Sequence, residues 1–316
     1  MARIHELRQM TKVATMYYSQ GLTQKEITTK LHIHQSTVSR LLRRAQDTNI
    51  VRITVTLPSG IFAELEQTIE KKFELTEAVV VDSGTDERTI ARDLGGAAAF
   101  LLESTVNPGD TIGISSWSEA LLAMVDALHP SQSAANGKVV QILGGLGNPG
   151  GQSHATHLTR RLAELTSASP VLLPAPGIVG SAEHRKVLLK DKFVQEATAL
   201  FSRIDVALVG IGALEPSKLL ASSGNSFPPK ELNVLKRQGA VGDICLRFFN
   251  QEGVPVRSAL NNCVIAVELA DLRRARRVVG VAGGARKHRA ILAALRGRWI
   301  NVLITDKATA EFLAEE

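Results

Sequence analysis

Short apolar runs alternate with amphipathic helical patterns between residues 78 and 306. The runs are AVVVDS, TIGIS, KVVQIL, VLLPAP, DVALVGIG, CLRFF, RVVGVAGG and VLITD. Strands that read as almost continuous Val, Ile and Leu are buried on both faces, which is typical of a parallel sheet with helices on each side. The pattern therefore predicts an α/β domain with a mostly parallel, Rossmann-like sheet. Within it, the segment RFFNQEGVPV indicates an antiparallel hairpin or excursion.

The N-terminal region differs from the rest of the chain in its charge. Residues 1–52 contain nine Lys and Arg against three Asp and Glu, a surplus equal to the formal net charge of +6 of the whole chain. The remaining residues are therefore balanced. A positive surplus confined to one short segment is typical of a nucleic-acid-binding module.

This basic region carries the pattern of a helix-turn-helix. A first helix is expected over residues 4–18, and Gly21 ends it. A second, short helix begins at Thr23, where Glu26 completes a capping box. A turn over residues 32–34 leads to a third helix over about residues 35–46. The first helix is expected to bury one face, formed by Ile4, Leu7, Met10 or Thr11, Val13 or Ala14, and Tyr17 or Tyr18.

The third helix has the side chains that a DNA recognition helix needs. The start of such a helix lies in the major groove, where Gln, Ser, Thr and Arg bond to base edges, while later arginines reach phosphates. The expected DNA-binding residues are Thr23, Gln24, Gln35, Ser36, Thr37, Ser39 and Arg40, with Arg43 and Arg44 on phosphates. The alternative is a three-helix bundle whose charged face is only solvated.

Three regions are expected along the chain. They are a helix-turn-helix DNA-binding domain over residues 1–55, a linker or oligomerisation helix over 56–76, and a ligand-binding domain over 77–316. The stretch VRITVTLPSG reads as a short strand or an extended linker. Apolar residues at four-residue spacing from Ile61 to Phe73 predict a helix, which either forms a dimer contact or docks on the core of its own domain.

Candidate ligand-binding residues follow three of the predicted strands. Ligands in open α/β sheets bind beyond the carboxyl ends of the strands, where glycines allow close approach and helix N-termini favour anions. The residues of these turns are Ser115, Ser116 and Ser118 after TIGIS, Gly144, Gly145, Gly147 and Gln152 after KVVQIL, and Gly283, Gly284 and Lys287 after RVVGVA. The alternative is that each glycine serves only a tight turn.

Other kinds of site find little support in the residues. Cys245 and Cys263 form no CxxC, so neither a disulfide framework nor a zinc site is expected. His154 and His157 lack a carboxylate or cysteine partner nearby. The GxGxxG-like stretch at residues 145–150 lies outside the first βα unit, so a dinucleotide is not expected. We expect no metal, no cofactor and no catalytic residue.

The N-terminus and the charge runs add two further expectations. The first residues have no apolar signal core, and no apolar run approaches the roughly 18 residues of a membrane span. Together with the free cysteines, this favours the cytoplasm. The run RRARR at residues 273–277 is expected to be a helix end with a solvated face, and the alternative is a second anion site.

Several blocks in order resemble the SorC family of bacterial sugar-responsive transcriptional regulators. They are LTQKEITTKLHIHQSTVSRLLRRA, GDTIGISSW, LGGLG, LPAPGIV, VGIGALEP, GAVGDICLRFFNQEG and VAGGARKHRAILAALRGRWINVLITDKATA, and the resemblance covers nearly the whole chain. It implies a C-terminal domain similar in fold to sugar-phosphate isomerases and deaminases. It also implies a sugar, polyol or sugar-phosphate effector, operator DNA as partner, and a homo-oligomer, a dimer or more often a tetramer.

The resemblance adds Asp243 to the effector site, because a carboxylate suits paired hydroxyls, and it assigns Lys287 to a phosphate. One departure matters. The family often has a cation after the Trp of this motif, whereas here Ser118 and Glu119 follow Trp117. This exchange favours a neutral sugar or polyol over a phosphorylated effector.

Two classes of function are consistent with these residues. The first is a regulator, more specifically a repressor, of a carbohydrate or polyol catabolic operon. The second is a sugar-phosphate isomerase or deaminase with a fused DNA-binding head, since Asp243 and Lys287 could supply an acid and a base. The site motifs resemble the regulators, so we predict a protein that is not an enzyme. A recombinase would need a DNA-handling surface that the balanced charge of residues 53–316 does not offer.

Overall fold

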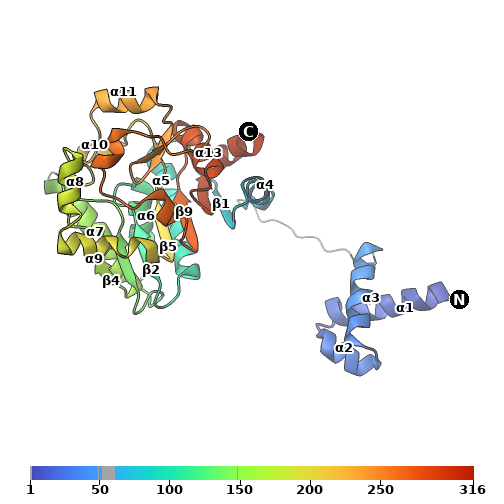
Figure 1. Ribbon diagram of the computed structural model, residues 1–316. Helices are drawn as coiled ribbons and strands as arrows, with labels where there is room; N and C mark the ends of the chain where they lie inside the picture. Colours follow the sequence, from blue (N-terminus) through green and yellow to red (C-terminus); the bar gives the residue numbers. More distant parts are fainter. Residues whose placement is uncertain (1, 49, 52–60, 148) are drawn as a thin grey trace. The chain divides into compact units, whose positions relative to one another are not determined.

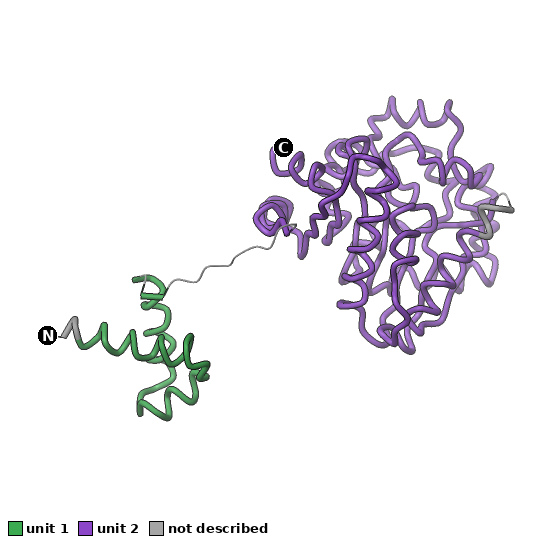
Figure 2. The backbone as a smooth tube through the Cα atoms, turned by 180° about the vertical axis from the view of Figure 1, so that it is seen from behind, with its two compact units in different colours: residues 1–58 green, residues 59–316 purple. Residues whose placement is uncertain are grey.

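The computed structural model describes residues 2–48, 50–51, 61–147 and 149–316, except for the side chains of residues 2–4 and 149–153. The chain forms two compact units, an N-terminal unit of residues 1–58 and a C-terminal unit of residues 59–316 (Figure 2). The segment VRITVTLPSG, expected to be a strand or linker, lies almost entirely outside the described residues.

Helices account for the described part of the N-terminal unit. They are α1 Ala2–Ala14, a π-helical turn η1 Thr15–Ser19, α2 Gln24–Leu31 and α3 Gln35–Asp47. Side chains from all three α-helices meet in one core, in which Val13, Ile27 and Val38 are fully buried. The predicted helix-turn-helix elements are therefore confirmed.

The start and end of α2 follow from its sequence. The Thr23 hydroxyl accepts a hydrogen bond from the Glu26 amide at 3.3 Å, and the Glu26 carboxylate accepts one from the Thr23 amide at 2.8 Å. This is the predicted capping box, which satisfies amides that a helix start leaves free. His32 ends the helix in the left-handed conformation, with φ at 53°.

The buried face of the first helix differs from the prediction. Leu7, Tyr17 and Tyr18 are exposed, whereas Met16 is buried. For the two tyrosines the cause is the π-helical turn η1, in which an extra residue shifts the register of the residues that follow. Leu7 lies before this turn, and nothing in the structure explains its exposure. The prediction for Leu7 and the two tyrosines was therefore wrong.

A seven-stranded parallel sheet forms the centre of the C-terminal unit (Figure 1). In spatial order its strands are β1 Glu77–Val81, β10 Val302–Asp306, β9 Arg277–Val281, β5 Val206–Val209, β2 Thr111–Ile114, β3 Lys138–Gln141 and β4 Ser169–Val171. Every neighbouring pair is parallel. In β5, Val206 and Leu208 pack into one apolar cluster and Ala207 and Val209 into the other. Both faces are buried, as the apolar runs predicted.

Helices cover the two faces of the sheet. The first cluster takes apolar side chains from α5 Glu87–Thr105, α6 Glu119–Ala127 and α7 Pro149–Thr166. The second takes them from α4 Ala63–Phe73, α9 Lys192–Thr198, α12 Leu269–Leu272, α13 His288–Arg296 and α14 Lys307–Glu315. The remaining α-helices are α8 Ala182–Leu188, α10 Lys218–Ser222 and α11 Pro229–Arg237, of which α11 adds the buried Leu235 to the second cluster. The 3-10 turns are η2 Phe201–Arg203, η3 Ala259–Cys263 and η4 Ala285–Lys287.

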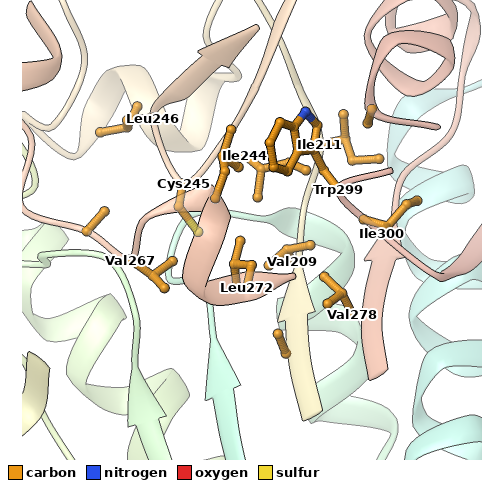
Figure 3. Close-up of a cluster of buried hydrophobic side chains, with 14 of the residues drawn as sticks. Val209, Ile211, Ile244, Cys245, Leu246, Val267, Leu272, Val278, Trp299 and Ile300 are labelled. Carbon is orange, nitrogen blue, oxygen red and sulfur yellow. The ribbon is translucent and has the colours of Figure 1, made fainter. Parts of the chain in front are cut away.

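A small antiparallel sheet stands apart from the large one. It consists of β6 Gly212–Ala213, β7 Gly242–Ile244 and β8 Arg247–Phe249. The predicted antiparallel excursion is confirmed, because β8 pairs with β7 and Phe249 forms a further antiparallel bridge with Pro255. Ile244 of β7 belongs to the buried cluster in Figure 3, which also holds Ile211 and Trp299.

Helix α4 covers one edge of the large sheet, at strand β1. Its Glu66 and Glu70 carboxylates accept hydrogen bonds from the amides of Val80 and Ala78 in the edge strand β1, at 2.9 and 2.8 Å. Ile69, between the two glutamates, is fully buried in the second cluster. An edge strand with unpaired amides invites pairing with other chains. The helix expected over residues 61–73 thus docks on the core of its own unit. The boundary between the two units falls at Pro58, so this helix belongs to the C-terminal unit.

Replacement of Glu70 by Ala should destabilise the C-terminal unit. The Ala78 amide, which is partly buried, then loses a charged acceptor, and we expect the free energy of unfolding in urea to fall by about 1–3 kcal/mol. Glu64→Ala, an exposed position on the same helix, is the matched control and should change it by less than about 0.5 kcal/mol. Equal effects of the two substitutions would contradict the role of Glu70 at the sheet edge.

Candidate functional site

A pocket lies where the connections of the large sheet diverge. Strands β2 and β5 are neighbours, but the chain continues from β2 to β3 and β4 on one side and from β5 to β9 and β10 on the other. Such a switch point leaves a crevice beyond the carboxyl ends of the two strands. The pocket is lined by residues that follow β2, β5 and β9, by the start of α5, and by the small sheet.

Five of the predicted effector residues line this pocket. They are Ser115, Ser118, Asp243, Gly283 and Lys287. They come from the connections after β2 and β9 and from strand β7, which the fold brings together. The Ser118 hydroxyl accepts a hydrogen bond from the Leu121 amide at 3.3 Å and so caps α6.

Other predicted effector residues do not belong to the lining. Ser116 is buried beneath it, and its hydroxyl donates to the Leu143 carbonyl at 3.4 Å. Of the turn after β3, Leu143 lines the pocket, while Gly144, Gly145 and Gly147 lie against other chain segments, where a Cβ atom would collide. Gly284 lies in a turn with φ at 89°, and its amide donates to the Asp306 carboxylate at 2.7 Å. Gln152 lies in α7, and its side chain is outside the described residues.

Asp243 is a buried carboxylate at the inner wall. Its side chain accepts a hydrogen bond from the Leu246 amide at 2.8 Å, and its second oxygen lies against Gly212, where no side chain could fit. Burial raises the pKa of Asp243 to about 6, against the opposing effects of the Leu246 hydrogen bond and of the Lys287 charge. This carboxyl group can therefore change its charge near neutral pH.

The turn beside Asp243 has an unusual backbone. Cys245 and Leu246 connect β7 and β8 with φ at 53° and 61°, the left-handed region that Asn and Gly usually occupy in such two-residue hairpins. Each residue in this region costs on the order of 1 kcal/mol or more. Burial raises the pKa of the Cys245 thiol to about 12, so the thiol stays protonated. Strain that persists in a pocket wall is typical of functional sites.

Arg247 holds this hairpin to its surroundings. Its buried guanidinium pairs with the Glu268 carboxylate at 2.8 Å and donates to the carbonyls of Val267 and Asn261 at 3.3 and 3.1 Å. Burial lowers the pKa of Arg247, and the Glu268 charge opposes that shift.

Charged side chains surround the mouth of the pocket. Arg286 donates to the Glu87 carboxylate at 2.9 Å and to the Glu215 carbonyl at 3.1 Å, and so links three elements. Burial is the main cause that lowers the pKa of Lys287; the Arg286 charge adds to it, whereas the charges of Glu87, Glu119 and Asp243 oppose it. The sequence analysis missed Glu87 and Arg286. Arg286 follows the glycine turn after β9, so its position was a usable signal, but Glu87 carried none.

Other motifs have structural explanations. His154 stacks on Trp117, with ring centroids 5.6 Å apart, and burial lowers its pKa. The arginines of the run at residues 273–277 contact neighbours: Arg276 pairs with Asp110 at 2.7 Å, and Arg273 stacks on Trp299 at 4.2 Å. Within the described residues there is no group of three or more His, Cys, Asp or Glu that could hold a metal ion. No helix there is long and apolar enough to cross a membrane.

Helix α3, the predicted recognition helix, exposes most of the predicted DNA-binding residues. Exposed are Thr23, Gln35, Ser36, Ser39, Arg40, Arg43 and Arg44, and half-buried are Gln24 and Thr37. On the opposite side of α3, Val38, Leu41 and Leu42 are buried. Arg44 pairs with Glu6 of α1, so its charge is already engaged within the unit.

This chain is similar in sequence and in structure to known bacterial regulators. Residues 60–315 match a family model described as "Putative sugar-binding domain". The chain is 35% identical over 306 residues to the deoxyribonucleoside regulator of Bacillus subtilis, with 96% of both chains covered. It is 33% identical to the sorbitol operon regulator of Klebsiella pneumoniae, with 99% of both covered. The crystal structure of full-length SorC from Klebsiella pneumoniae superposes with a TM-score of 0.73 at 31% identity, over 98% of this chain and 99% of that one.

The raised pKa of Asp243 predicts a pH dependence of stability. The unfolded state loses this proton near pH 4 and the folded state near pH 6, so the folded state is stabilised below pH 4 and loses that stability as the pH rises towards 7. The loss is at most about 3 kcal/mol. Asp243→Asn should remove it, as measured by urea unfolding of the full chain at pH 4 and pH 7.

Asp126→Asn, at an exposed position on α6, is the control for the loss of one carboxyl group. It should leave the difference between the two pH values as in the wild type. An unchanged difference in Asp243→Asn would show that this carboxyl is not the titrating group.

Proposed function

We propose, because this chain belongs to the SorC family of sugar-responsive transcriptional regulators, that it binds an operator through α3 and binds a sugar, polyol or sugar phosphate in the pocket of its C-terminal unit. We propose further that it represses an operon for carbohydrate or polyol breakdown. The observation that carries this is the pocket with polar side chains at the switch point, in a chain whose helix α3 also exposes Gln, Ser and Arg side chains.

The DNA-binding part rests on the two faces of α3. Its buried side anchors the helix in the core of the unit, which leaves Gln35, Ser39 and Arg40 free to reach base edges in the major groove. Arg43 lies one turn further along and suits a phosphate. The ion pair of Arg44 with Glu6 makes Arg44 a weaker candidate for phosphate.

The effector part rests on the polar groups of the pocket. The Asp243 carboxylate can accept two hydrogen bonds from neighbouring hydroxyls, Lys287 can donate, and the Ser115 hydroxyl can do either. Apolar residues such as Ile90, Leu143 and Ile211 provide a surface for the carbon side of a sugar. An effector that favours one arrangement of the oligomer changes operator affinity by that preference. We propose a homo-oligomer, a dimer or tetramer, in the cytoplasm.

An enzyme that isomerises or deaminates a sugar phosphate is the alternative. It would use Asp243 and Lys287 as acid and base, which general acid–base chemistry permits. The relatives found at high coverage are named as regulators, and this favours the regulator.

A thermal-shift screen of the full chain against sugars, polyols and their phosphates tests the proposal, followed by operator binding with each compound that stabilises the protein. We expect one compound to raise the melting temperature and to change the operator affinity. Turnover of that compound would support the enzyme instead.

The recognition helix can be tested by salt dependence. Arg43→Ala should weaken binding to all DNA sequences to a similar degree and lower the slope of log K against log salt by about one. Gln35→Ala should remove discrimination between operator and random DNA and leave the slope unchanged. Fluorescence anisotropy at several salt concentrations measures both. A sequence-selective loss in Arg43→Ala would contradict its assignment to a phosphate.

Asp243→Ala should separate the two activities. We expect operator affinity close to the wild type, because Asp243 lies in the C-terminal unit, and a loss of the response to effector. Asp126→Ala serves as the surface control and should respond normally. If the Asp243 variant still responds, the effector site lies elsewhere.

A further inference from the structure

We propose that the pocket selects an uncharged polyhydroxy effector and rejects its phosphate esters, and that Glu119 is the residue that sets this specificity. The inference rests on the proposed function, which places the effector in this pocket.

The charged side chains of the described lining carry a net negative charge. The acids are Glu87, Glu119, Glu215 and Asp243, and the bases are Arg286 and Lys287. A phosphate monoester brings a further charge of about −1.5 to −2 at neutral pH. Such an anion would enter a partly buried space where carboxylates outnumber cations two to one, and the low dielectric of that space strengthens the repulsion.

Arg286 already has an acidic partner, and Lys287 lies near three carboxylates. The Arg286 guanidinium donates one hydrogen bond to the Glu87 carboxylate at 2.9 Å and another to the Glu215 carbonyl at 3.1 Å. Lys287 is half-buried and lies in the fields of Glu87, Glu119 and Asp243. A phosphate would have to compete with these carboxylates for each cation.

The start of α6, which lies at the pocket, is also unfavourable for an anion. A free helix N-terminus attracts anions through its unpaired amides and its dipole. In α6, however, the Ser118 hydroxyl already accepts from the Leu121 amide, and Glu119 places a carboxylate in the first turn. One amide of this helix start is thus already engaged, and the Glu119 carboxylate adds a negative charge that opposes a phosphate there.

The same groups suit a ligand with hydroxyls and no charge. Each carboxylate can accept hydrogen bonds from two neighbouring hydroxyls, and bonds to charged acceptors are stronger than neutral ones. Of the acids, Glu87 is held in its pair with Arg286 and Asp243 anchors the turn at Leu246. Glu119 is half-buried and takes part in neither contact, so it can be neutralised without breaking them.

Calorimetry on the full chain tests this with two matched pairs, sorbitol with sorbitol 6-phosphate and 2-deoxyribose with 2-deoxyribose 5-phosphate. We expect the wild-type protein to bind at least one parent compound at least 10-fold more tightly than its phosphate ester. Glu119→Gln should raise affinity for the ester about 10-fold and change that for the parent by less than 3-fold, whereas Glu64→Gln on α4 should change neither. An ester that binds the wild type more tightly than its parent overturns the proposal.

If neither pair of compounds binds, quenching of Trp117 fluorescence tests whether the pocket disfavours anions. The chain has two tryptophans, and Trp299→Phe leaves Trp117 in the pocket wall as the reporter. We expect iodide to quench less than neutral acrylamide, and Glu119→Gln to raise iodide quenching at least 2-fold. Equal quenching by iodide and acrylamide that Glu119→Gln does not change overturns the proposal.

Operator binding separates the failure of the two proposals. A parent compound that binds with the expected preference but leaves operator affinity unchanged refutes the proposed function and supports the selectivity of the pocket.

Discussion

Burial of both faces of a parallel sheet is the constraint on which the C-terminal unit depends. Parallel strands need crossover connections, and these place helices on each face. In this chain the crossovers turn one way after β2 and the other way after β5, so no connection covers the carboxyl ends of those two strands. The pocket exists at that point because the layers that bury the sheet cannot close there.

The pocket wall contains features that reduce stability. Asp243 is buried with its pKa raised, and Cys245 and Leu246 have left-handed backbones. Two contacts hold these features in place, the hydrogen bond from the Leu246 amide to Asp243 and the network around Arg247 and Glu268. A rigid surrounding that maintains an unfavourable local geometry is what a preorganised binding site requires.

The C-terminal unit begins with a helix that is bonded to the same sheet. Through Glu66 and Glu70, helix α4 holds β1, which pairs with β10, which pairs with β9. At the far end of these strands, Asp306 at the end of β10 accepts from the Gly284 amide, close to the pocket residues Gly283 and Lys287. The pocket and helix α4 thus share one continuous set of hydrogen-bonded elements.

Local patterns in the sequence were sufficient for the helix-turn-helix, the parallel sheet and the turns of Ser115 and Gly283 beyond it. Capping, apolar spacing and strand composition act between near neighbours, so they can be read along the chain. Tertiary structure alone decided that Leu143 rather than Gly144 lines the pocket, that Arg286 meets Glu87, and that Met16 replaces Tyr17 in the core. These depend on which strand ends become neighbours and on one π-helical turn, and neither leaves a periodic trace in the sequence.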